Sequence, residues 1–459
     1  MTAAVIALPW SGQNEEAMTT SGAGMATQAI KTRRFRTALR DDRREALLDS
    51  GAAFLLTRGL VLAIAVVAAL VADPAGSADA IHFDDPALTQ PFGHTLDALL
   101  SPLARWDSTW FLGIARDGYD GGNGAAFFPL YPLLVRVVAL GSSDPRALLV
   151  AAYAVSLASF AGALYLLHRL AEVELGPSRA RAAVLLLALF PGALYFGAPY
   201  SESLFLLLSV GAFYAARTGR WAWAGALAGA ASGTRSAGIL LLAPLVVLYL
   251  YGPRTDRAPD ATDPPWWKPR HRPRRDIAWL ALAPAGLAAY TLYLAVTAGD
   301  AFAYLHLQDQ WFRSFAGPFA GVWDGAVAAW DGVRQLASGS REHVYFTAAA
   351  NDPFVVAQRN ITEFAFLLFA LAGTVGVLKR LPAAYGVYVV AALALPLSFP
   401  VAPHPLMSLA RFVAVLFPIF MWLAVACAGR PWRMNAAVGV SALGLGASTA
   451  FFATWHFFA

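Results

Sequence analysis

The sequence predicts an all-α protein that crosses a membrane many times. Of its 459 residues, 58% are hydrophobic and only 14% are charged, whereas soluble globular proteins carry about 25% charged residues. Apolar runs of about 20 residues, the length that spans a bilayer, recur along the chain. Because lipid offers no partner for backbone N–H and C=O groups, such runs are expected to be helices.

Eleven apolar runs are candidates for spanning helices, and the range consistent with the pattern is ten to twelve. They cover residues 53–72, 146–169, 181–198, 200–217, 221–234, 236–252, 277–298, 361–378, 383–400, 409–428 and 434–456. Helices that are buried all round have no polar face, so their ends are fixed only to within a few residues. One or two of the shorter runs are also compatible with re-entrant segments.

Basic residues orient these runs, because Lys and Arg in short loops remain on the cytoplasmic side. Segments 31–44 and 253–276 each carry seven basic residues. Smaller groups of basic residues begin at Arg169, Arg217, Lys379 and Arg430. All of them fall on one side if residues 125–141 do not cross the membrane. That stretch contains two prolines and an arginine, so we expect a helix that lies along the outer interface.

The resulting organisation is a single transmembrane domain behind a short tail. Residues 1–50 are expected to be a disordered basic cytoplasmic tail, without the pattern of a cleaved signal peptide. Residues 51–459 form the transmembrane domain, with an outer loop at 73–145, a cytoplasmic loop at 253–276 and an outer loop at 299–360. We therefore expect a multi-pass protein of the cell inner (plasma) membrane with a cytoplasmic N-terminus. Its lone cysteine excludes an internal disulfide, and the clustering of basic residues in loops does not suggest nucleic-acid binding.

Ionisable residues collect in the outer turns, where proximity to lipid makes them costly unless they have partners or a function. They are Asp107, Glu202, Arg235, His404 and Arg411. Structural roles remain open for most of them: Glu202 could begin a helix, Arg235 could form an ion pair, and His404 could sit in an exposed loop. Arg411 is harder to explain in this way, because it falls three residues into a predicted helix.

The stretch "ARWDSTWFLGIARDGYD" (104–120) stands out in the first outer loop. It predicts a short amphipathic helix that begins near Asp107, and an N-cap role for that aspartate is the simplest structural explanation. Arg105, Trp106 and Trp110 surround it, however. Tryptophan rings there could stack on a sugar and keep water from a carboxylate that acts as a base. The two later aspartates are each followed by glycine and are typical of turns.

No Ser–His–Asp elbow, CxxC, HExxH or phosphate-binding glycine loop occurs, and no His/Cys cluster has the spacing of a metal site. We therefore predict neither a metal nor a cofactor. What remains is a carboxylate with arginines on the outer face. Arginine binds phosphate through a planar fork, and a carboxylate can deprotonate a hydroxyl, so the combination suits group transfer from an anionic lipid.

Three motifs give the sequence a family resemblance. "RWDSTWFLGIARDGYDGGNGAAFFPLYPLLVR", "FGAPYSESLFLLLSVGAFY" and "LARFVAVLFPIF" resemble the bacterial relatives of GPI mannosyltransferase II (phosphatidylinositol glycan class V), in the GT-C glycosyltransferase superfamily. The resemblance implies a GT-C-type inverting glycosyltransferase that uses a polyprenyl-phosphate sugar, most often mannose, on the non-cytoplasmic side.

The resemblance also assigns roles to residues. Asp107 matches the acidic catalytic residue of the first outer loop, and Tyr200 and Glu202 lie in the second outer turn as substrate-binding candidates. Arg235 and Arg411, with His404 nearby, are candidates for the lipid phosphate. Arg105, Trp106 and Trp110 complete the set expected to bind substrate.

The implied partners are a polyprenyl-phosphate sugar donor, a lipid-linked or cell-envelope glycan acceptor, and the bilayer. GPI anchors are eukaryotic, whereas this Ala- and Arg-rich composition is typical of bacteria, so the acceptor is left open. Alternatives are a GT-C enzyme using another polyprenyl sugar such as arabinose or glucose, or a flippase of lipid-linked sugars. The outward concentration of the polar residues argues against a flippase, which needs binding elements accessible from both faces.

Overall fold

A computed structural model describes residues 23–72, 83–119, 123–260, 265, 267–308, 313–346 and 352–456, with side chains from residue 43 onward. Two compact units are distinguished, residues 1–47 and residues 48–459. Helix α1 (Ala23–Val71) begins in the first unit and ends in the second.

Every regular element among the described residues is a helix, as the sequence predicts. In chain order these are α3 (Pro86–Thr89), α4 (His94–Leu100), α5 (Asp107–Asp117), η2 (Asn123–Ala126), α6 (Leu130–Val138), α7 (Pro145–Leu175), α8 (Pro177–Leu189), η3 (Pro191–Gly197), α9 (Glu202–Arg217), α10 (Trp221–Thr234), η4 (Ser236–Leu241), α11 (Leu242–Tyr251), η5 (Arg275–Leu282), α12 (Ala285–Thr297), α13 (Ala303–His306), α14 (Ala320–Ser338), α15 (Pro353–Arg380), α16 (Ala383–Leu397), α17 (Leu409–Ala414), α18 (Phe417–Cys427) and α19 (Pro431–Ala453).

Local sequence explains where the long helices start. α7 and α15 both begin at a proline preceded by an aspartate, and the Asp144 and Asp352 side chains accept hydrogen bonds from the N–H groups two residues later. Aspartate at the N-cap and proline at the first helical position both favour a helix start. Gly176, with a φ of +89°, then makes the turn between α7 and α8.

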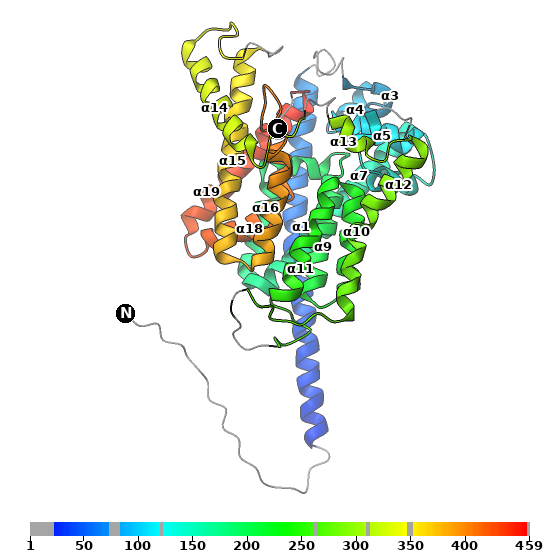
Figure 1. The fold of residues 1–459 in the computed structure, drawn as a ribbon, viewed down its shortest axis with the longest axis vertical. Coiled ribbons are helices and arrows are strands. Elements are labelled where there is room, and N and C mark those ends of the chain that lie inside the picture. The colour runs from blue at the N-terminus through cyan, green and yellow to red at the C-terminus, as the bar shows by residue number, and fades with distance from the viewer. Residues whose placement is uncertain are drawn as a thin grey trace. The chain divides into compact units, whose positions relative to one another are not determined.

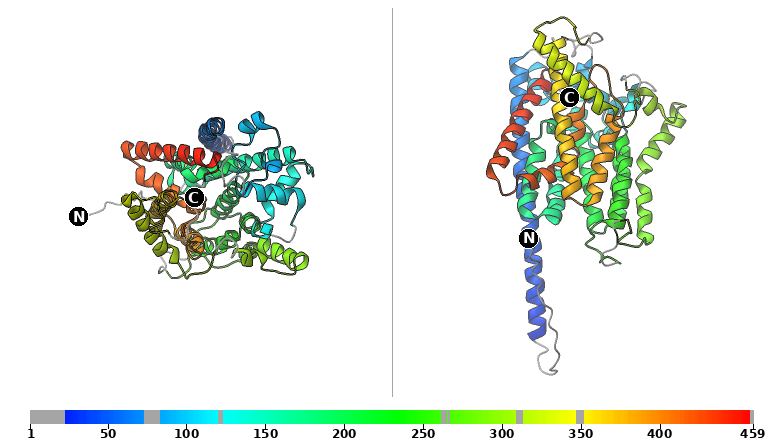
Figure 2. Two further views of the ribbon diagram at one scale, coloured as in Figure 1. Left: turned by 90° about the horizontal axis from the view of Figure 1, so that it is seen from above. Right: turned by 60° about the vertical axis from the view of Figure 1, so that its left-hand side comes forward.

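The long helices pack side by side into a bundle (Figures 1 and 2). α7 packs against α8 and α9, α9 against α10, and α10 against η5 and α12. On the other side α15 packs against α14 and α18, and α11 packs against α16. The buried core runs through these contacts, with Phe160, Phe213 and Phe417 among its largest side chains.

Within the described part of the chain, four helices are long and apolar enough to cross a membrane: Arg43–Val71, Pro145–Leu175, Pro353–Arg380 and Pro431–Ala453. The pairs Pro177–Leu189 with Pro191–Gly197, and Arg275–Leu282 with Ala285–Thr297, raise this to six if each bent pair is one span. Every predicted run overlaps one helix or two consecutive helices. The prediction of an all-α, multi-pass membrane protein is confirmed, while the count of eleven spans stays a prediction.

Of the two bent helix pairs, α8 and η3 are the more sharply bent and meet at 81°. Proline at residue 191 cannot donate a backbone hydrogen bond, so the helix cannot continue through it unchanged. Arg58 of α1 satisfies carbonyl groups on both sides of the break: Nη1 donates to Ala193 O at 2.9 Å and Nη2 to Ala188 O at 3.5 Å. Its guanidinium also lies 4.7 Å from the ring centroid of Phe160. The buried arginine therefore holds the bent segment in place.

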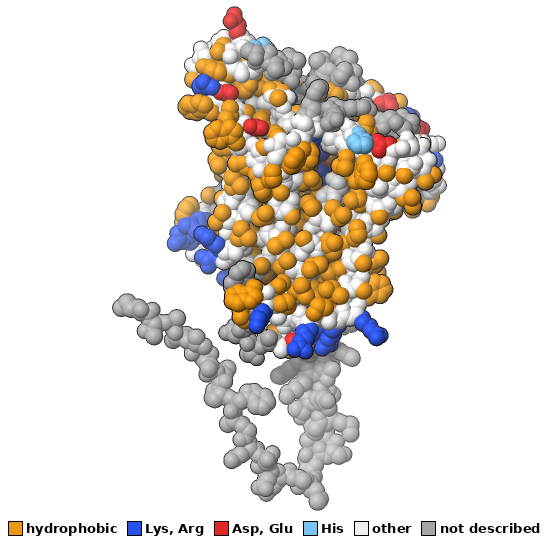
Figure 3. Space-filling view, viewed as in Figure 1, with side chains coloured by type: hydrophobic (Ala, Val, Ile, Leu, Met, Phe, Trp, Pro, Cys, Tyr) orange, Lys and Arg blue, Asp and Glu red, His pale blue; other side chains and the backbone are white. Residues whose placement is uncertain are grey.

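The two ends of the bundle differ in charge. α3, α4 and α5 lie at one end, whereas the loop that follows α11 lies at the opposite end (Figure 1). Hydrophobic side chains cover the sides, and most of the visible Lys and Arg side chains gather toward the end that carries this loop (Figure 3). This separation agrees with the predicted segregation of basic loops from the first outer loop.

Two differences from the sequence predictions concern the tail 1–50 and the loop 299–360, whereas the stretch 125–141 agrees with its prediction. α1 begins at Ala23, within the predicted disordered tail 1–50, because this stretch is rich in residues that favour helix, such as Ala, Arg and Leu; residues 1–22 lie outside the described part. Within 125–141, α6 has nine residues and is too short to cross a bilayer, as expected. The outer loop 299–360 is largely helical, since it contains α13, α14 and the start of α15.

Candidate active site

Helix α5 starts at Asp107, and its N-cap is Trp106, whose side chain makes no capping bond. Asp107 is therefore not the N-cap of α5, which was its simplest structural role, but the first residue inside the helix. Trp106 has a φ of +54°, which is uncommon for a bulky residue and costs about 1–3 kcal/mol. Its ring lies 5.4 Å from those of Phe83 and Trp455, and this packing holds the strained turn that aims Asp107.

Tyr200 fixes the same turn from the other side. Its buried hydroxyl accepts the backbone N–H of Asp107 at 3.1 Å and donates to the carbonyl oxygen of Arg105, also at 3.1 Å. One side chain therefore bridges the residues before and after Trp106. Since Tyr200 belongs to the "PYSES" turn, this contact ties the two most distinctive motifs of the sequence together.

The carboxylate of Asp107 is the first member of a row of side chains with alternating charge. Asp107 Oδ2 accepts a hydrogen bond from Arg411 Nη1 at 2.5 Å, and Arg411 Nε lies 3.0 Å from Glu202 Oε1. Glu202 Oε1 in turn accepts a hydrogen bond from Arg235 Nη1. Four residues separated by as much as 304 positions in the sequence thus form one network, Asp107–Arg411–Glu202–Arg235.

Each member of the network comes from a different element. Asp107 and Glu202 are the first residues of α5 and α9, Arg235 follows the last residue of α10, and Arg411 lies on α17. Carboxylates in the first turn also complement the helix dipole. The Glu202 side chain is 2% exposed, whereas those of Asp107, Arg235 and Arg411 are 25%, 17% and 17% exposed. Glu202 is therefore the buried member of the network, and the side chains of the other three are partly accessible to solvent.

The remaining predicted residues from the first outer loop lie beside the network. Arg105 is buried and donates to the carbonyl oxygens of Ser101 and Ala104, with its guanidinium 5.5 Å from the ring centroid of Trp455. Trp110 stacks on Phe127 at 5.6 Å and an interplanar angle of 13°. Trp106 and Trp110 both remain partly exposed on either side of Asp107 in the sequence.

His404 belongs to a neighbouring polar cluster. Its Nδ1 lies 2.9 Å from Asn360 Oδ1, and Asn360 Nδ2 donates to Pro403 O at 3.0 Å. Burial, with the nearby Arg359, lowers the pKa of His404 to about 4, so the ring is neutral at pH 7. Sequence reasoning did not single out Asn360, nor Glu363 one helical turn further along α15, which is buried.

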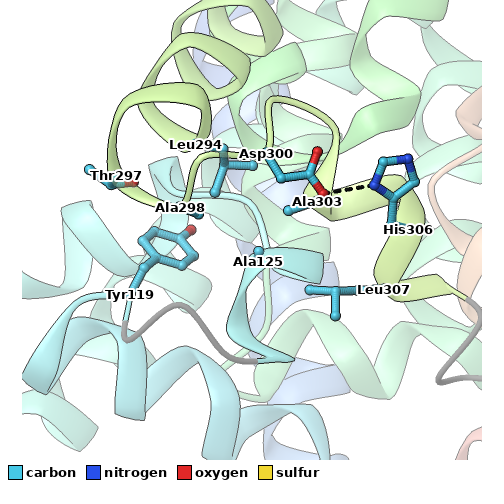
Figure 4. Close-up of a pocket in the computed structure, with 9 residues that line it drawn as sticks. All are labelled: Tyr119, Ala125, Leu294, Thr297, Ala298, Asp300, Ala303, His306 and Leu307. Carbon is cyan, nitrogen blue, oxygen red and sulfur yellow. Dashed lines mark hydrogen bonds and ion pairs between the residues drawn. The ribbon is translucent and has the colours of Figure 1, made fainter.

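A separate cavity of about 220 Å³ lies near the end of α5 remote from Asp107. Tyr119 and the C-terminal end of α12 line it, together with an Asp300–His306 pair at 2.7 Å (Figure 4). Since α5 has eleven residues, the cavity begins about 15 Å from its first residue. It is therefore distinct from the charged network.

The described residues contain no group of three or more His, Cys, Asp or Glu side chains that could hold a metal ion. Within the network, each carboxylate is paired with arginine. The arrangement offers a carboxylate that can take a proton and guanidinium groups that can bind an anion.

The sequence profile of the mannosyltransferase (PIG-V) family matches residues 53–251. Over that region the chain is similar to the mannosyltransferase (PIG-V) family. The region contains Asp107, Tyr200, Glu202 and Arg235, whereas Arg411 lies beyond it. The matched region thus contributes three of the four members of the network.

Curated relatives match over a similar part of the chain. The GPI alpha-1,6-mannosyltransferase 2 of Mus musculus is 33% identical over 177 residues, covering 37% of this chain and 33% of the relative. The corresponding Homo sapiens protein is 34% identical over 154 residues, covering 32% of this chain and 31% of the relative. The chain spans about a third of the length of these curated relatives.

Among solved structures, the apo form of the Archaeoglobus fulgidus oligosaccharyltransferase aligns with 85% of this chain and 55% of its own, at 12% identity and a TM-score of 0.41. The complex of Archaeoglobus fulgidus AglB with an inhibitory peptide and a dolichol-phosphate aligns with 73% of this chain and 48% of its own, at 15% identity and a TM-score of 0.37.

Proposed function

We propose that the chain is an inverting membrane glycosyltransferase of the GT-C type. It moves mannose from a polyprenyl-phosphate donor to a hydroxyl group of a lipid-linked or cell-envelope acceptor. The observation that carries the proposal is the Asp107–Arg411–Glu202–Arg235 network, which joins a partly exposed carboxylate to two partly exposed arginines. The similarity of residues 53–251 to the mannosyltransferase (PIG-V) family supports mannose as the sugar.

Asp107 is the proposed general base. The acceptor oxygen attacks the anomeric carbon of the donor while the bond from that carbon to the phosphate oxygen breaks. Asp107 takes the acceptor proton, and polyprenyl phosphate leaves with the bonding electrons. A single displacement of this kind inverts the anomeric centre and needs no covalent sugar–enzyme intermediate. Glu202 is too deeply buried to serve as the base, at 2% exposure.

Arg411 and Arg235 are the proposed ligands of the donor phosphate. In the structure Arg411 binds Asp107, so an incoming phosphate would offer the same guanidinium a second anionic partner and loosen its hold on the base. Glu202, beneath both arginines, keeps them oriented toward the open side. Charge-assisted hydrogen bonds from arginine would also stabilise the charge that develops on the leaving group.

The other predicted substrate residues receive different roles. Trp106 and Trp110 remain partly exposed and would give the acceptor an apolar surface beside Asp107. Arg105 and His404 bind backbone or amide groups next to the site. We assign both to holding the backbone around the site.

We further propose that the site faces away from the cytoplasm, in the plasma membrane, with the N-terminus inside. The basic loop 253–276 at the end of the bundle remote from α5 supports this orientation (Figure 1). In a cysteine-free background, cysteine at the exposed Ser143 should react with a membrane-impermeant maleimide in intact cells, and cysteine at the exposed Ala258 should not. The reverse pattern would refute the orientation.

The decisive experiment is mannose transfer by Asp107→Asn. Purified protein would receive polyprenyl-phosphate-[14C]mannose and membrane lipid acceptors, and release of polyprenyl phosphate would be followed. Loss of a positioned base lowers the rate by about 10²–10⁴-fold. Asp117→Asn, at the exposed far end of the same helix, is the matched control and should keep wild-type turnover.

Near-normal transfer by Asp107→Asn would refute the catalytic assignment. Movement of unchanged labelled donor across the bilayer would instead indicate a flippase. Competition with polyprenyl-phosphate arabinose and glucose would identify the sugar, since the wild type should release the lipid phosphate only from the mannose donor.

A further inference from the structure

Three arginines surround one aromatic ring at the site. The guanidinium carbons of Arg235, Arg411 and Arg313 lie 5.6, 5.7 and 6.0 Å from the ring centroid of Phe412. Phe412 is the residue after Arg411 on α17, and the other two arginines come from the end of α10 and from the segment before α14. The proposed phosphate site is therefore lined by one more cation than the two proposed above.

Carboxylates compensate two of these cations. Arg411 contacts Asp107 and Glu202, and Arg235 binds Glu202. Arg313 differs, because within the described part of the chain it forms no ion pair, and its Nη2 donates to the carbonyl oxygen of Met407 at 3.3 Å. Three arginines thus share two contacting carboxylates, which leaves one positive charge in surplus.

The surroundings of Arg313 keep it cationic but poorly neutralised. Burial, and then the neighbouring Arg411, lower the pKa of Arg313 to about 10, while Glu363 and Asp107 partly oppose this shift. The side chain is consequently still protonated at neutral pH. A partly buried cation whose side chain has one carbonyl partner among the described residues is costly, and an anion that enters beside Phe412 would relieve that cost.

We propose that Arg313 binds the phosphate of the lipid-linked donor and, after transfer, that of the lipid phosphate product. This inference rests on the proposed function and adds a third arginine to its phosphate site. The ligand is a phosphate group carried on a lipid chain: a diester in the donor and a monoester in the product. Asp107 and Glu202 partly neutralise Arg411 and Arg235, so Arg313 supplies the positive charge that remains for the phosphate.

A structural role alone would be to fasten residue 313 to the loop that precedes α17, through Met407 O. The two roles separate in a binding measurement on the full-length protein in nanodiscs. Its probes are polyprenyl phosphate and the polyprenol of the same chain length. A bond from a charged donor is worth about 1.5–3 kcal/mol, so Arg313→Gln should weaken binding of the phosphate about tenfold to hundredfold and leave that of the alcohol unchanged.

Two further variants complete the test. Arg313→Lys retains the charge and should keep most of the preference for the phosphate over the alcohol. Arg341→Gln removes an arginine from the same outer segment, where it is exposed and paired with Asp352 at 3.0 Å, and should bind both lipids as the wild type does. Thermal midpoints of all variants would show that each is folded.

An undiminished preference for the phosphate in Arg313→Gln would overturn the inference, as would an equal loss of affinity for phosphate and alcohol. Displacement of the lipid phosphate by millimolar inorganic phosphate would assign the site to the free anion and also overturn it. The proposed function fails separately: wild-type protein that binds the lipid phosphate but transfers no mannose would refute the enzyme and leave the role of Arg313 standing.

Discussion

The hydroxyl group of Tyr200 accepts the backbone N–H of Asp107 at 3.1 Å. Through its second bond, to Arg105 O, it determines where α5 begins and hence where the Asp107 carboxylate points. The position of the proposed base therefore depends on a residue 93 positions away in the sequence. This dependence leads to the first prediction.

Tyr200→Phe should lower kcat for mannose transfer about tenfold to hundredfold, because small displacements of a catalytic group are costly. KM should stay within about twofold of the wild-type value, since Tyr200 touches no proposed substrate atom. Tyr131→Phe is the matched control: its buried hydroxyl also forms two bonds, to Ala152 and Ser156. Equal loss of kcat in both variants would show that the effect is one of general stability.

Glu202→Gln should both destabilise the protein and abolish most transfer. Breaking a buried ion pair by removing one partner costs about 3–5 kcal/mol, and Arg235 and Arg411 would then lose their orientation. Glu174→Gln offers a control, because Glu174 pairs with Arg217 and accepts the hydroxyl of Tyr385 in the bundle, outside the network. Turnover per folded molecule should fall only in Glu202→Gln; a matching fall in Glu174→Gln would contradict the role of Glu202 at the site.

His404 should make the protein less stable in mild acid. In the folded state its pKa is lowered to about 4 by burial and Arg359, against an ordinary value of about 6.5. Between these values the unfolded chain binds a proton that the folded chain does not, so stability is lost as the pH falls from about 6.5 toward 4. His404→Gln should lose less of its thermal midpoint over this range than the wild type.

A control for the loss of a histidine is His343→Gln, at an exposed position. An identical pH dependence of the thermal midpoint in His404→Gln and the wild type would contradict the assignment of this effect to residue 404.

Gly229→Ala should disturb the packing of α10 against the bent pair of helices η5 and α12. A methyl group on Gly229 would lie 2.5 Å from the carbonyl oxygen of Leu282, whereas one on Gly439 of α19 meets nothing within 4 Å. Overpacking of this kind costs about 1–3 kcal/mol. Gly439→Ala removes a flexible helical glycine at no steric cost and should be neutral or slightly stabilising. Equal thermal midpoints for the two variants would refute the close approach.

Much of the fold could be predicted from apolar runs alone, because lipid leaves helices as the available structure. The breaks are harder to place. Residues 409–428 were predicted as one span, but the helix is interrupted at Val415 and Leu416, between α17 and α18. Pro418, which lies in the first turn of α18, was the feature of the sequence that could have indicated this break. Arg411 consequently lies on a short helix that faces the site rather than lipid.

The members of the site could be predicted, but their pairing could not. The cost of charge near lipid singled out Asp107, Glu202, Arg235 and Arg411 one at a time. Nothing local says that Arg411 binds Asp107, since 304 positions separate them. Glu363 lies inside the predicted span 361–378, so the energetic cost of a charge within the bilayer could have singled it out as well. Arg313 lies in the predicted outer loop 299–360 and belongs to no motif, and its place beside Phe412 in the structure reveals it.

The contact of Arg58 with the break between α8 and η3 bears on how the chain is assembled. Arg58 belongs to α1, and the carbonyl groups of Ala188 and Ala193 to which it donates are synthesised about 130 residues later. Until the two segments meet, the guanidinium group lacks these partners, and a charged group without partners is costly inside a bilayer. Insertion of α1 and formation of the bend that leads into Tyr200 and Glu202 are therefore expected to be coupled steps of assembly.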